Sequence, residues 1–195
     1  LDDDETTAVL TLAKMRDGSK GQIEFEYDGP TGLFTERGLV TPREPGQLAL
    51  ETPAGRVLTR YTQERGRVRT VRLTNVPSFL YRQGLRVECP ELGGTLVVDV
   101  AFGGNFYAIV EPQEGYGGID ALGAQRILSI SPRLRERLNR AHDFVHPEDP
   151  RIRGLTHVQW CDGPLQAGSD ARNAVFYGDQ AIDRSPCGTG TSARM

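Results

Sequence analysis

Short β-like runs separated by turn-forming residues dominate this chain, which has 23 glycines and 12 prolines among its 195 residues. Glycine and proline interrupt regular structure, so the runs between them are short and favour strands. The candidate strands cover residues 7–14, 22–27, 47–51, 56–62, 67–75, 85–89, 95–102, 106–111, 154–161 and 172–177. Only residues 119–142 have apolar side chains at helical spacing, and Pro132 within them predicts two short helices joined at that proline. The pattern predicts a strand-rich α+β fold.

The composition is that of an ordinary soluble domain, with 37% hydrophobic and 25% charged residues. No apolar run approaches the roughly 18 residues that a membrane helix needs. The formal net charge of -3 gives no reason to expect a polyanionic partner. The arginine-rich stretch at 133–140 is interpreted as a solvated helix face. We therefore expect neither a nucleic acid nor a membrane as partner.

The three cysteines, Cys89, Cys161 and Cys187, are widely spaced. They form no CxxC pair and have no histidine at ligand spacing, which argues against a disulfide framework or a zinc site. Cys89 and Cys161 lie in or beside strand runs, where a free cysteine usually acts as a small buried apolar side chain. The chain opens with Leu1 and an acidic run rather than a basic and apolar secretory leader. A reducing, cytoplasmic compartment is therefore expected.

The final run, DRSPCGTGTSARM from Asp183 to Met195, combines a thiol with a helix-opening pattern. Cys187 precedes glycines and hydroxyl residues that resemble the first turn of a helix, where backbone N–H groups are free and the dipole is positive. Both favour an anion, so we expect the thiol pKa to fall. The same donors could hold a substrate carboxylate, and Asp183 could pair with a cationic group. A tight turn around a buried cysteine is the alternative.

Five segments resemble, in order, those of the proline racemase family, which includes proline racemases, 4-hydroxyproline epimerases and trans-3-hydroxyproline dehydratases. The segments are LETPAGRV (50–57), NVPSFLY (75–81), VDVAFGGNFYAIVEPQ (98–113), FVHPEDPRIRGLTHVQW (144–160) and ARNAVFYGDQAIDRSPCGTGTSARM (171–195). The resemblance covers about residues 37–195. It implies a diaminopimelate epimerase-like α+β fold with a strand-rich mixed sheet, present here as an incomplete copy. It also implies a cofactor-independent racemase or epimerase that moves the Cα proton of proline or 4-hydroxyproline between cysteine thiols.

Transferred residue by residue, the resemblance makes Cys187 the second of two acid/base thiols. Asp183 would contact the substrate amine, the amides of Gly188 and Thr189 would hold its carboxylate, and Tyr177 would form an aromatic wall. The segment corresponding to the first cysteine motif, Gly21–Glu26 (GQIEFE), contains no cysteine. Two alternatives follow: a non-catalytic fragment with half of the substrate pocket, or a relative of the single-cysteine trans-3-hydroxyproline dehydratases. The expected partner is a small-molecule substrate, and a homodimer is left open.

Residues 1–35 do not resemble that family and are expected to form a segment of different origin, followed by the partial domain at 36–195. Thr7–Lys14 and Gln22–Tyr27 predict a two-stranded antiparallel hairpin. The stretch 13–35 is similar to the last hairpin of the motor domain in hexameric replicative helicases. There Lys14 and Arg16 would reach a neighbouring subunit's nucleotide. The sequence contains no Walker A motif, so a fused reading frame and a plain structural hairpin both stay open.

Two further features are interpreted as structural. Gly103-Gly104-Asn105 lies between two strand runs without a GxGxxG pattern, which favours a turn or a close backbone approach over a phosphate loop. His146, His157 and Trp160 lack a carboxylate at useful spacing, so we expect them to pack rather than react.

Overall fold

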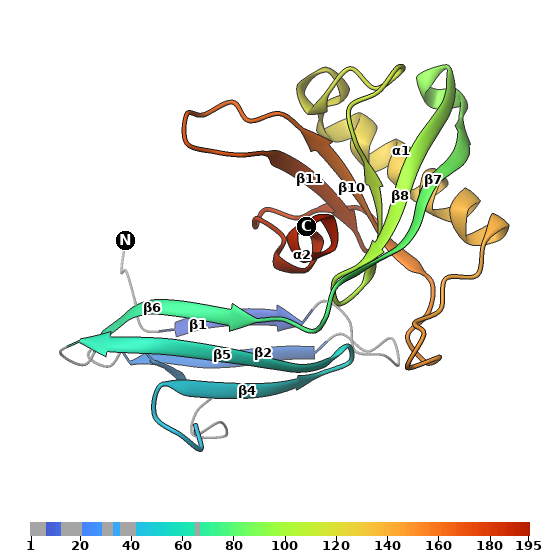
Figure 1. The fold of residues 1–195 in the computed structure, drawn as a ribbon. Coiled ribbons are helices and arrows are strands. Elements are labelled where there is room, and N and C mark those ends of the chain that lie inside the picture. The colour runs from blue at the N-terminus through green and yellow to red at the C-terminus, as the bar shows by residue number, and fades with distance from the viewer. Residues whose placement is uncertain (1–6, 13–20, 29–32, 36–41, 65–66) are drawn as a thin grey trace. The chain divides into compact units, whose positions relative to one another are not determined.

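The structure is a computed structural model that describes residues 7–12, 21–28, 33–35, 42–64 and 67–195 (Figure 1). By its internal contacts the chain divides into two compact units, Leu1–Val76 and Pro77–Met195. Each unit is described by itself below. The expected change of origin between residues 35 and 36 stays a prediction.

The first unit contains two three-stranded antiparallel sheets. One has the order β1-β2-β3, with β1 (Thr7–Leu12), β2 (Gly21–Asp28) and β3 (Leu33–Thr35). The other has the order β4-β5-β6, with β4 (Gln47–Thr52), β5 (Gly55–Glu64) and β6 (Arg67–Thr74). The pairing of Thr7 with Glu26 through Leu12 with Gly21 confirms the expected hairpin, to which the short β3 adds a third strand. Lys14 and Arg16 lie outside the described residues.

The second unit is built on one mixed six-stranded sheet with the order β12-β11-β10-β9-β8-β7. Its strands are β7 (Phe79–Cys89), β8 (Gly94–Phe102), β9 (Phe106–Val110), β10 (Leu155–Asp162), β11 (Arg172–Tyr177) and β12 (Ala181–Ile182). All neighbouring pairs are antiparallel except β9 and β10, which are parallel. A short 3-10 helix, η1 (Pro90–Leu92), joins β7 to β8. The expected strand-rich α+β fold is confirmed.

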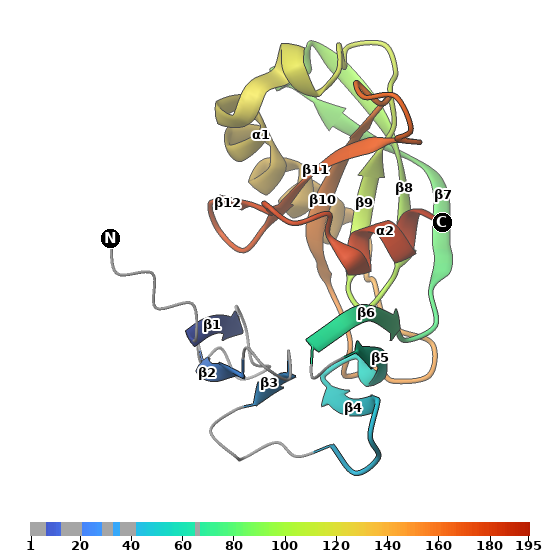
Figure 2. The same ribbon diagram turned by 90° about the vertical axis from the view of Figure 1, so that its left-hand side faces the viewer.

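Both faces of this sheet are covered by helices. Figure 2 shows α1 (Ile119–Ala141) and α2 (Gly188–Arg194) on opposite sides of it. Side chains alternate between the faces along a strand, and on β10 the indole of Trp160 donates to Ser131 of α1 at 2.9 Å. The neighbouring Cys161 instead belongs to a buried cluster with Cys187 and Ala193, on the side of α2. Because both faces are buried, all five residues of β9 are buried.

The helix α1 does not break where the sequence predicted. Pro132 lies inside the helix, and the break is at Gly123, which has φ 68° and ψ 161°. Glycine adopts this backbone conformation without a steric penalty, whereas a proline removes one hydrogen bond that packing against the sheet can offset. Ser131, directly before Pro132, is fully buried and accepts the indole hydrogen bond from Trp160. The expectation of two helices joined at Pro132 is therefore wrong, because packing against the sheet keeps the helix continuous there.

Gly103, in the turn between β8 and β9, lies directly under α2. A Cβ placed on Gly103 would be 2.2 Å from the Thr189 carbonyl oxygen and 2.6 Å from the Ala193 nitrogen, both backbone atoms of the helix. No side chain fits in such a gap, so only glycine allows the helix to approach this closely. The expectation of a close backbone approach is confirmed.

Candidate functional site

Cys187 lies immediately before α2 and is 5% exposed. Its backbone has φ 57° and ψ 81°, and within the described part of the chain it is the one non-glycine residue with a positive φ. For a residue with a side chain this left-handed conformation costs on the order of 1–3 kcal/mol, and such strain concentrates at functional sites. The backbone N–H of Cys187 donates to the Ser185 hydroxyl at 3.1 Å, which helps hold the turn.

The Cys187 sulfur faces a hydroxyl group from a strand far away in the sequence. The Tyr107 hydroxyl lies 3.6 Å from the sulfur and 2.5 Å from the Thr189 hydroxyl oxygen. Burial raises the pKa of the Cys187 thiol above its ordinary value, and hydrogen bonds from Tyr107 and the Gly190 amide offset only part of this effect. The expectation of a lowered thiol pKa is therefore wrong for this arrangement. That expectation took account of the helix terminus but not of the burial of the sulfur away from water.

Asp183 is held in the same loop. Its carboxylate accepts a hydrogen bond from the Ser185 backbone N–H at 2.8 Å, and its own N–H donates to the Val175 carbonyl at 2.8 Å. Partial burial opposes ionisation, but the hydrogen bonds from Ser185 and Cys187 outweigh it and hold the pKa of Asp183 below its ordinary value. A carboxylate is therefore kept beside the thiol, and its negative charge helps raise the pKa of Cys187.

An aromatic stack supports the thiol from the side of the sheet. The His157 ring lies between Tyr107, with ring centroids 4.6 Å apart, and Tyr177, at 6.3 Å. Burial, followed by the nearby positive charge of Arg135, lowers the pKa of His157 to about 4, so the ring is neutral near pH 7. The packing role expected for His157 is confirmed, and the stack connects Tyr177 to the tyrosine that contacts Cys187.

Two residues of this environment, Tyr107 and Gln159, were not singled out from the sequence. They lie on the parallel strands β9 and β10, two positions apart in register, because Ile109 pairs with Gln159. Gln159 is fully buried, and its amide nitrogen donates to the Cys161 sulfur at 3.8 Å. Strand alternation places Tyr107 and Ile109 on one face, but no local sequence pattern predicts that this face packs against Cys187.

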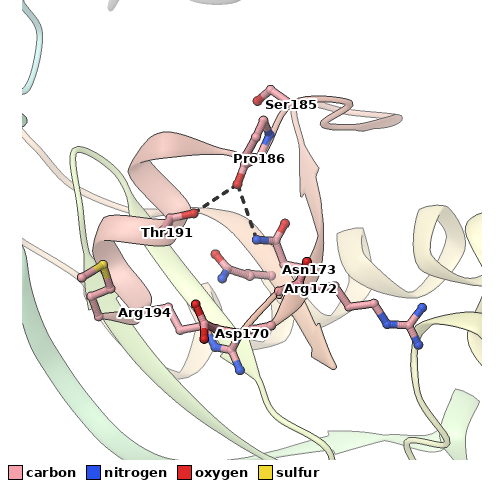
Figure 3. Close-up of a pocket in the computed structure, with 11 residues that line it drawn as sticks. Asp170, Arg172, Asn173, Ser185, Pro186, Thr191 and Arg194 are labelled. Carbon is pink, nitrogen blue, oxygen red and sulfur yellow. Dashed lines mark hydrogen bonds between the residues drawn. The ribbon is translucent and has the colours of Figure 1, made fainter. Parts of the chain in front are cut away.

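A cavity of ≈ 730 Å³ adjoins α2 on the side of β10 and β11 (Figure 3). Its lining includes Gln159, Asp170, Asn173, Ser185, Thr191 and Arg194. The Pro186 carbonyl accepts hydrogen bonds from the Thr191 hydroxyl at 3.1 Å and from the Asn173 amide at 3.5 Å, which ties the turn before Cys187 to β11. The cavity therefore borders the thiol turn.

The predicted site residues Asp183, Cys187, Gly188 and Thr189 lie within one loop and one helical turn. Cys89 and Cys161 are free and fully buried, as expected of apolar cysteines. In the described part of the chain, no three His, Cys, Asp or Glu side chains are grouped so as to hold a metal ion. Among the same residues, no helix combines the length and apolar character needed to cross a membrane.

Comparison with known proteins gives one consistent result. Residues 29–195 match the model of the family described as "Proline racemase". The chain is 58% identical over 167 residues to the "4-hydroxyproline epimerase" of Brucella ovis and to the "4-hydroxyproline 2-epimerase" of Brucella suis biovar 1. Each alignment covers 86% of this chain and 50% of the relative. The chain therefore spans about half the length of these curated relatives.

Two solved structures resemble the fold. A probable proline racemase from Agrobacterium radiobacter K84, with bound carbonate, superposes with a TM-score of 0.69 at 37% identity. A hydroxyproline epimerase from Agrobacterium vitis, with bound trans-4-OH-L-proline, superposes with a TM-score of 0.69 at 31% identity. Each comparison covers 81% of this chain and 46% of the solved one.

Proposed function

This chain belongs to the proline racemase family, and from that premise we propose that it supplies one acid/base thiol, Cys187, of a 4-hydroxyproline epimerase or proline racemase. One observation carries the proposal. The Cys187 sulfur lies at the start of α2, in hydrogen-bond contact with Tyr107, inside the run that matches the family. As the resemblance implies, the proposed reaction needs no cofactor.

The chemistry fits the groups around the thiol. A Cα proton is very weakly acidic, so its removal needs a base in a dehydrated site with donors that stabilise the developing charge. In the proposed role, the sulfur of Cys187 takes the Cα proton in one direction and returns it in the other. The amides of Gly188 and Thr189 have no carbonyl partner one turn earlier within α2, which leaves them suited to hold a carboxylate.

The other end of the substrate would face Asp183. This carboxylate stays ionised, because hydrogen bonds hold its pKa below the ordinary value, and it could pair with a secondary ammonium group. The relatives that are 58% identical are named 4-hydroxyproline epimerases. This favours 4-hydroxyproline over proline as the substrate. A homodimer and a cytoplasmic location stay predictions.

Exchange of the Cα proton tests the proposal directly. The purified chain is incubated with trans-4-hydroxy-L-proline or L-proline in D₂O, and loss of the α-proton signal is followed by NMR. A chain with one working thiol should exchange this proton with solvent, and a chain that also inverts the carbon should accumulate the epimer. Exchange no faster than in Cys187→Ser would contradict the catalytic role of this chain.

A second candidate is a non-catalytic chain that keeps half of the substrate pocket. It is favoured by one observation: Gly21–Glu26, where the resemblance led us to expect the first cysteine motif, has no cysteine and precedes the residues 29–195 that match the family. This candidate predicts binding without exchange. Titration calorimetry with trans-4-hydroxy-L-proline should then give a heat of binding that Asp183→Asn weakens. Exchange above the Cys187→Ser control would exclude it.

A further inference from the structure

The Tyr107 hydroxyl has one hydrogen and two neighbours that can accept it. Its oxygen lies 3.6 Å from the Cys187 sulfur and 2.5 Å from the Thr189 hydroxyl oxygen. The ring is held in place, because Tyr107 is fully buried and stacks against His157 with ring centroids 4.6 Å apart. The direction of the O–H bond can therefore change while the ring stays where it is.

The protonation state of Cys187 decides which neighbour should receive this hydrogen. In the thiol form, the S–H donates to the Asp183 carboxylate, and the neutral sulfur is a weak acceptor. The Thr189 oxygen is closer and accepts better, so it should take the tyrosine hydrogen. In the thiolate form, the sulfur is charged, and a hydrogen bond to an ionised acceptor is roughly twice as strong as one between neutral groups. The hydrogen should then turn to the sulfur.

Once the tyrosine hydrogen points to the sulfur, the short contact between the two hydroxyl oxygens needs a hydrogen from the other side. Threonine can supply it, because a hydroxyl both donates and accepts. Resting on the function proposed above, we propose that Thr189 is a positioning residue, whose hydroxyl donates to Tyr107 and directs the tyrosine hydrogen to the Cys187 sulfur in the thiolate form. The change needs only the rotation of two hydroxyl groups, and no covalent bond breaks at either residue.

This role belongs to the side chain of Thr189 and is separate from the role proposed for its backbone. The amide that would hold the substrate carboxylate needs no particular side chain. The hydroxyl contact with Tyr107 gives an independent reason for a hydroxyl residue in the first turn of α2. In a chain of hydrogen bonds each bond polarises the next, so the threonine should strengthen the donor that reaches the thiolate.

The remaining groups near the sulfur and the tyrosine oxygen do not replace this pair of hydroxyls. Asp183, in the loop before α2, disfavours the thiolate by its negative charge, and burial raises the thiol pKa further. His157 on β10 is neutral near pH 7, because burial lowers its pKa to about 4. Burial raises the pKa of Cys161 to about 12, so this thiol adds no charge. Besides the tyrosine, the Gly190 amide favours the thiolate.

The effect of the threonine on the thiol can be measured without turnover. The chain is labelled with ¹³C at the cysteine β-carbons and titrated by NMR from neutral to strongly alkaline pH, and Cys187→Ser identifies the signal. Thr189→Val keeps the shape and the backbone amide but removes the hydroxyl, whereas Thr189→Ser keeps the hydroxyl. Thr95→Val, at an exposed position on β8, is the matched control. Thr189→Val is also made in a chain that carries Tyr107→Phe.

Thr189→Val should raise the titration midpoint of Cys187 by about half a pH unit, which is roughly a threefold change in the ionisation constant, because hydrogen bonds that support a charge are the stronger ones. Thr189→Ser should titrate as the wild type does, and Thr95→Val should leave the midpoint unchanged. In the chain with Tyr107→Phe, Thr189→Val should have no further effect, since the hydroxyl acts through the tyrosine oxygen.

An unchanged or lowered midpoint in Thr189→Val overturns the proposal, and a lowered one means that the threonine competes with the sulfur for the tyrosine hydrogen. An equal rise in the chain with Tyr107→Phe also overturns it, because the hydroxyl then acts by another route. The same holds if Thr189→Ser raises the midpoint as much as Thr189→Val, because the packing of the side chain is then responsible instead of the hydroxyl.

The proton-exchange assay keeps this inference separate from the proposed function. Exchange of the α-proton, with no shift of the midpoint in Thr189→Val, would remove the role of the threonine hydroxyl and leave the function standing. A shifted midpoint in a chain that does not exchange the α-proton would leave the link between the three side chains and remove the function.

Discussion

The Tyr107 hydroxyl meets the Cys187 sulfur at 3.6 Å, although 80 residues separate the two in the sequence. Burial raises the pKa of the Tyr107 hydroxyl, so this group stays protonated and can donate. It also contacts the Thr189 hydroxyl oxygen at 2.5 Å, so one side chain joins β9 to the thiol and to the first turn of α2. Tyr107 therefore links the sheet to the proposed acid/base group.

Tyr107→Phe should raise the pKa of Cys187, because the variant loses the side-chain donor to the thiolate. The expected increase is about one pH unit in a cysteine ¹³C titration, with about 1 kcal/mol lost from the free energy of unfolding. Tyr81→Phe is the control, since its hydroxyl contacts the Asp143 carbonyl at 3.3 Å instead of the thiol. An unchanged midpoint in Tyr107→Phe would mean that the hydroxyl does not stabilise the thiolate.

Gly103→Ala should loosen the attachment of α2. Its new methyl group would overlap backbone atoms of Thr189 and Ala193, which cannot move aside without shifting the helix. Overpacking of this kind costs about 3 kcal/mol, and urea unfolding should show the loss. The control is Gly163→Ala, since a Cβ there meets nothing within 4 Å. Equal stability of the two variants would contradict the close approach of α2 to Gly103.

Ser131→Ala should destabilise the contact between α1 and the sheet. The serine oxygen accepts the indole N–H of Trp160 at 2.9 Å, and both residues are fully buried. Removing the oxygen leaves a buried donor without a partner, which costs about 1–3 kcal/mol. Ser129→Ala is the matched control on the same helix, because its hydroxyl is exposed and donates to the nearby Arg126 carbonyl at 3.0 Å. In guanidinium unfolding, we expect Ser131→Ala to have a clearly lower free energy of unfolding than Ser129→Ala.

The stability of the fold should decrease as the pH falls from 6.5 toward 4. Burial, followed by the charge of Arg135, lowers the pKa of His157 from 6.5 to about 4 in the folded state. The unfolded chain then binds more protons in this window, so stability is full above about pH 6.5 and is lost on acidification. Between pH 7 and pH 5 the loss should be about 2 kcal/mol.

Urea unfolding at the two pH values measures this loss. His157→Phe keeps an aromatic ring between the two tyrosines but cannot be protonated, so its stability should change less with pH. His142→Phe should keep the pH dependence of stability that the wild type has. If His157→Phe keeps the wild-type pH dependence as well, a group other than His157 causes it.

Much of the local structure could be predicted from short patterns in the sequence. Runs such as Thr95–Phe102 and Arg172–Tyr177 are strands because they are apolar or β-branched between turn formers. Cys187 precedes a helix because glycine and hydroxyl residues follow it. The two-residue strand β12 and the three-residue β3 were not predicted, since segments this short have no periodicity to detect.

The sequence by itself determined the strand-rich class, the family resemblance and the thiol before α2, because each depends on neighbouring residues. Only the tertiary structure decided that α1 breaks at Gly123, that the Cys187 thiol is buried away from water, and that Tyr107 contacts it. These outcomes depend on the parallel pairing of β9 with β10 and on the approach of α2 to Gly103. Both are contacts between distant segments, whose free energy no local pattern contains.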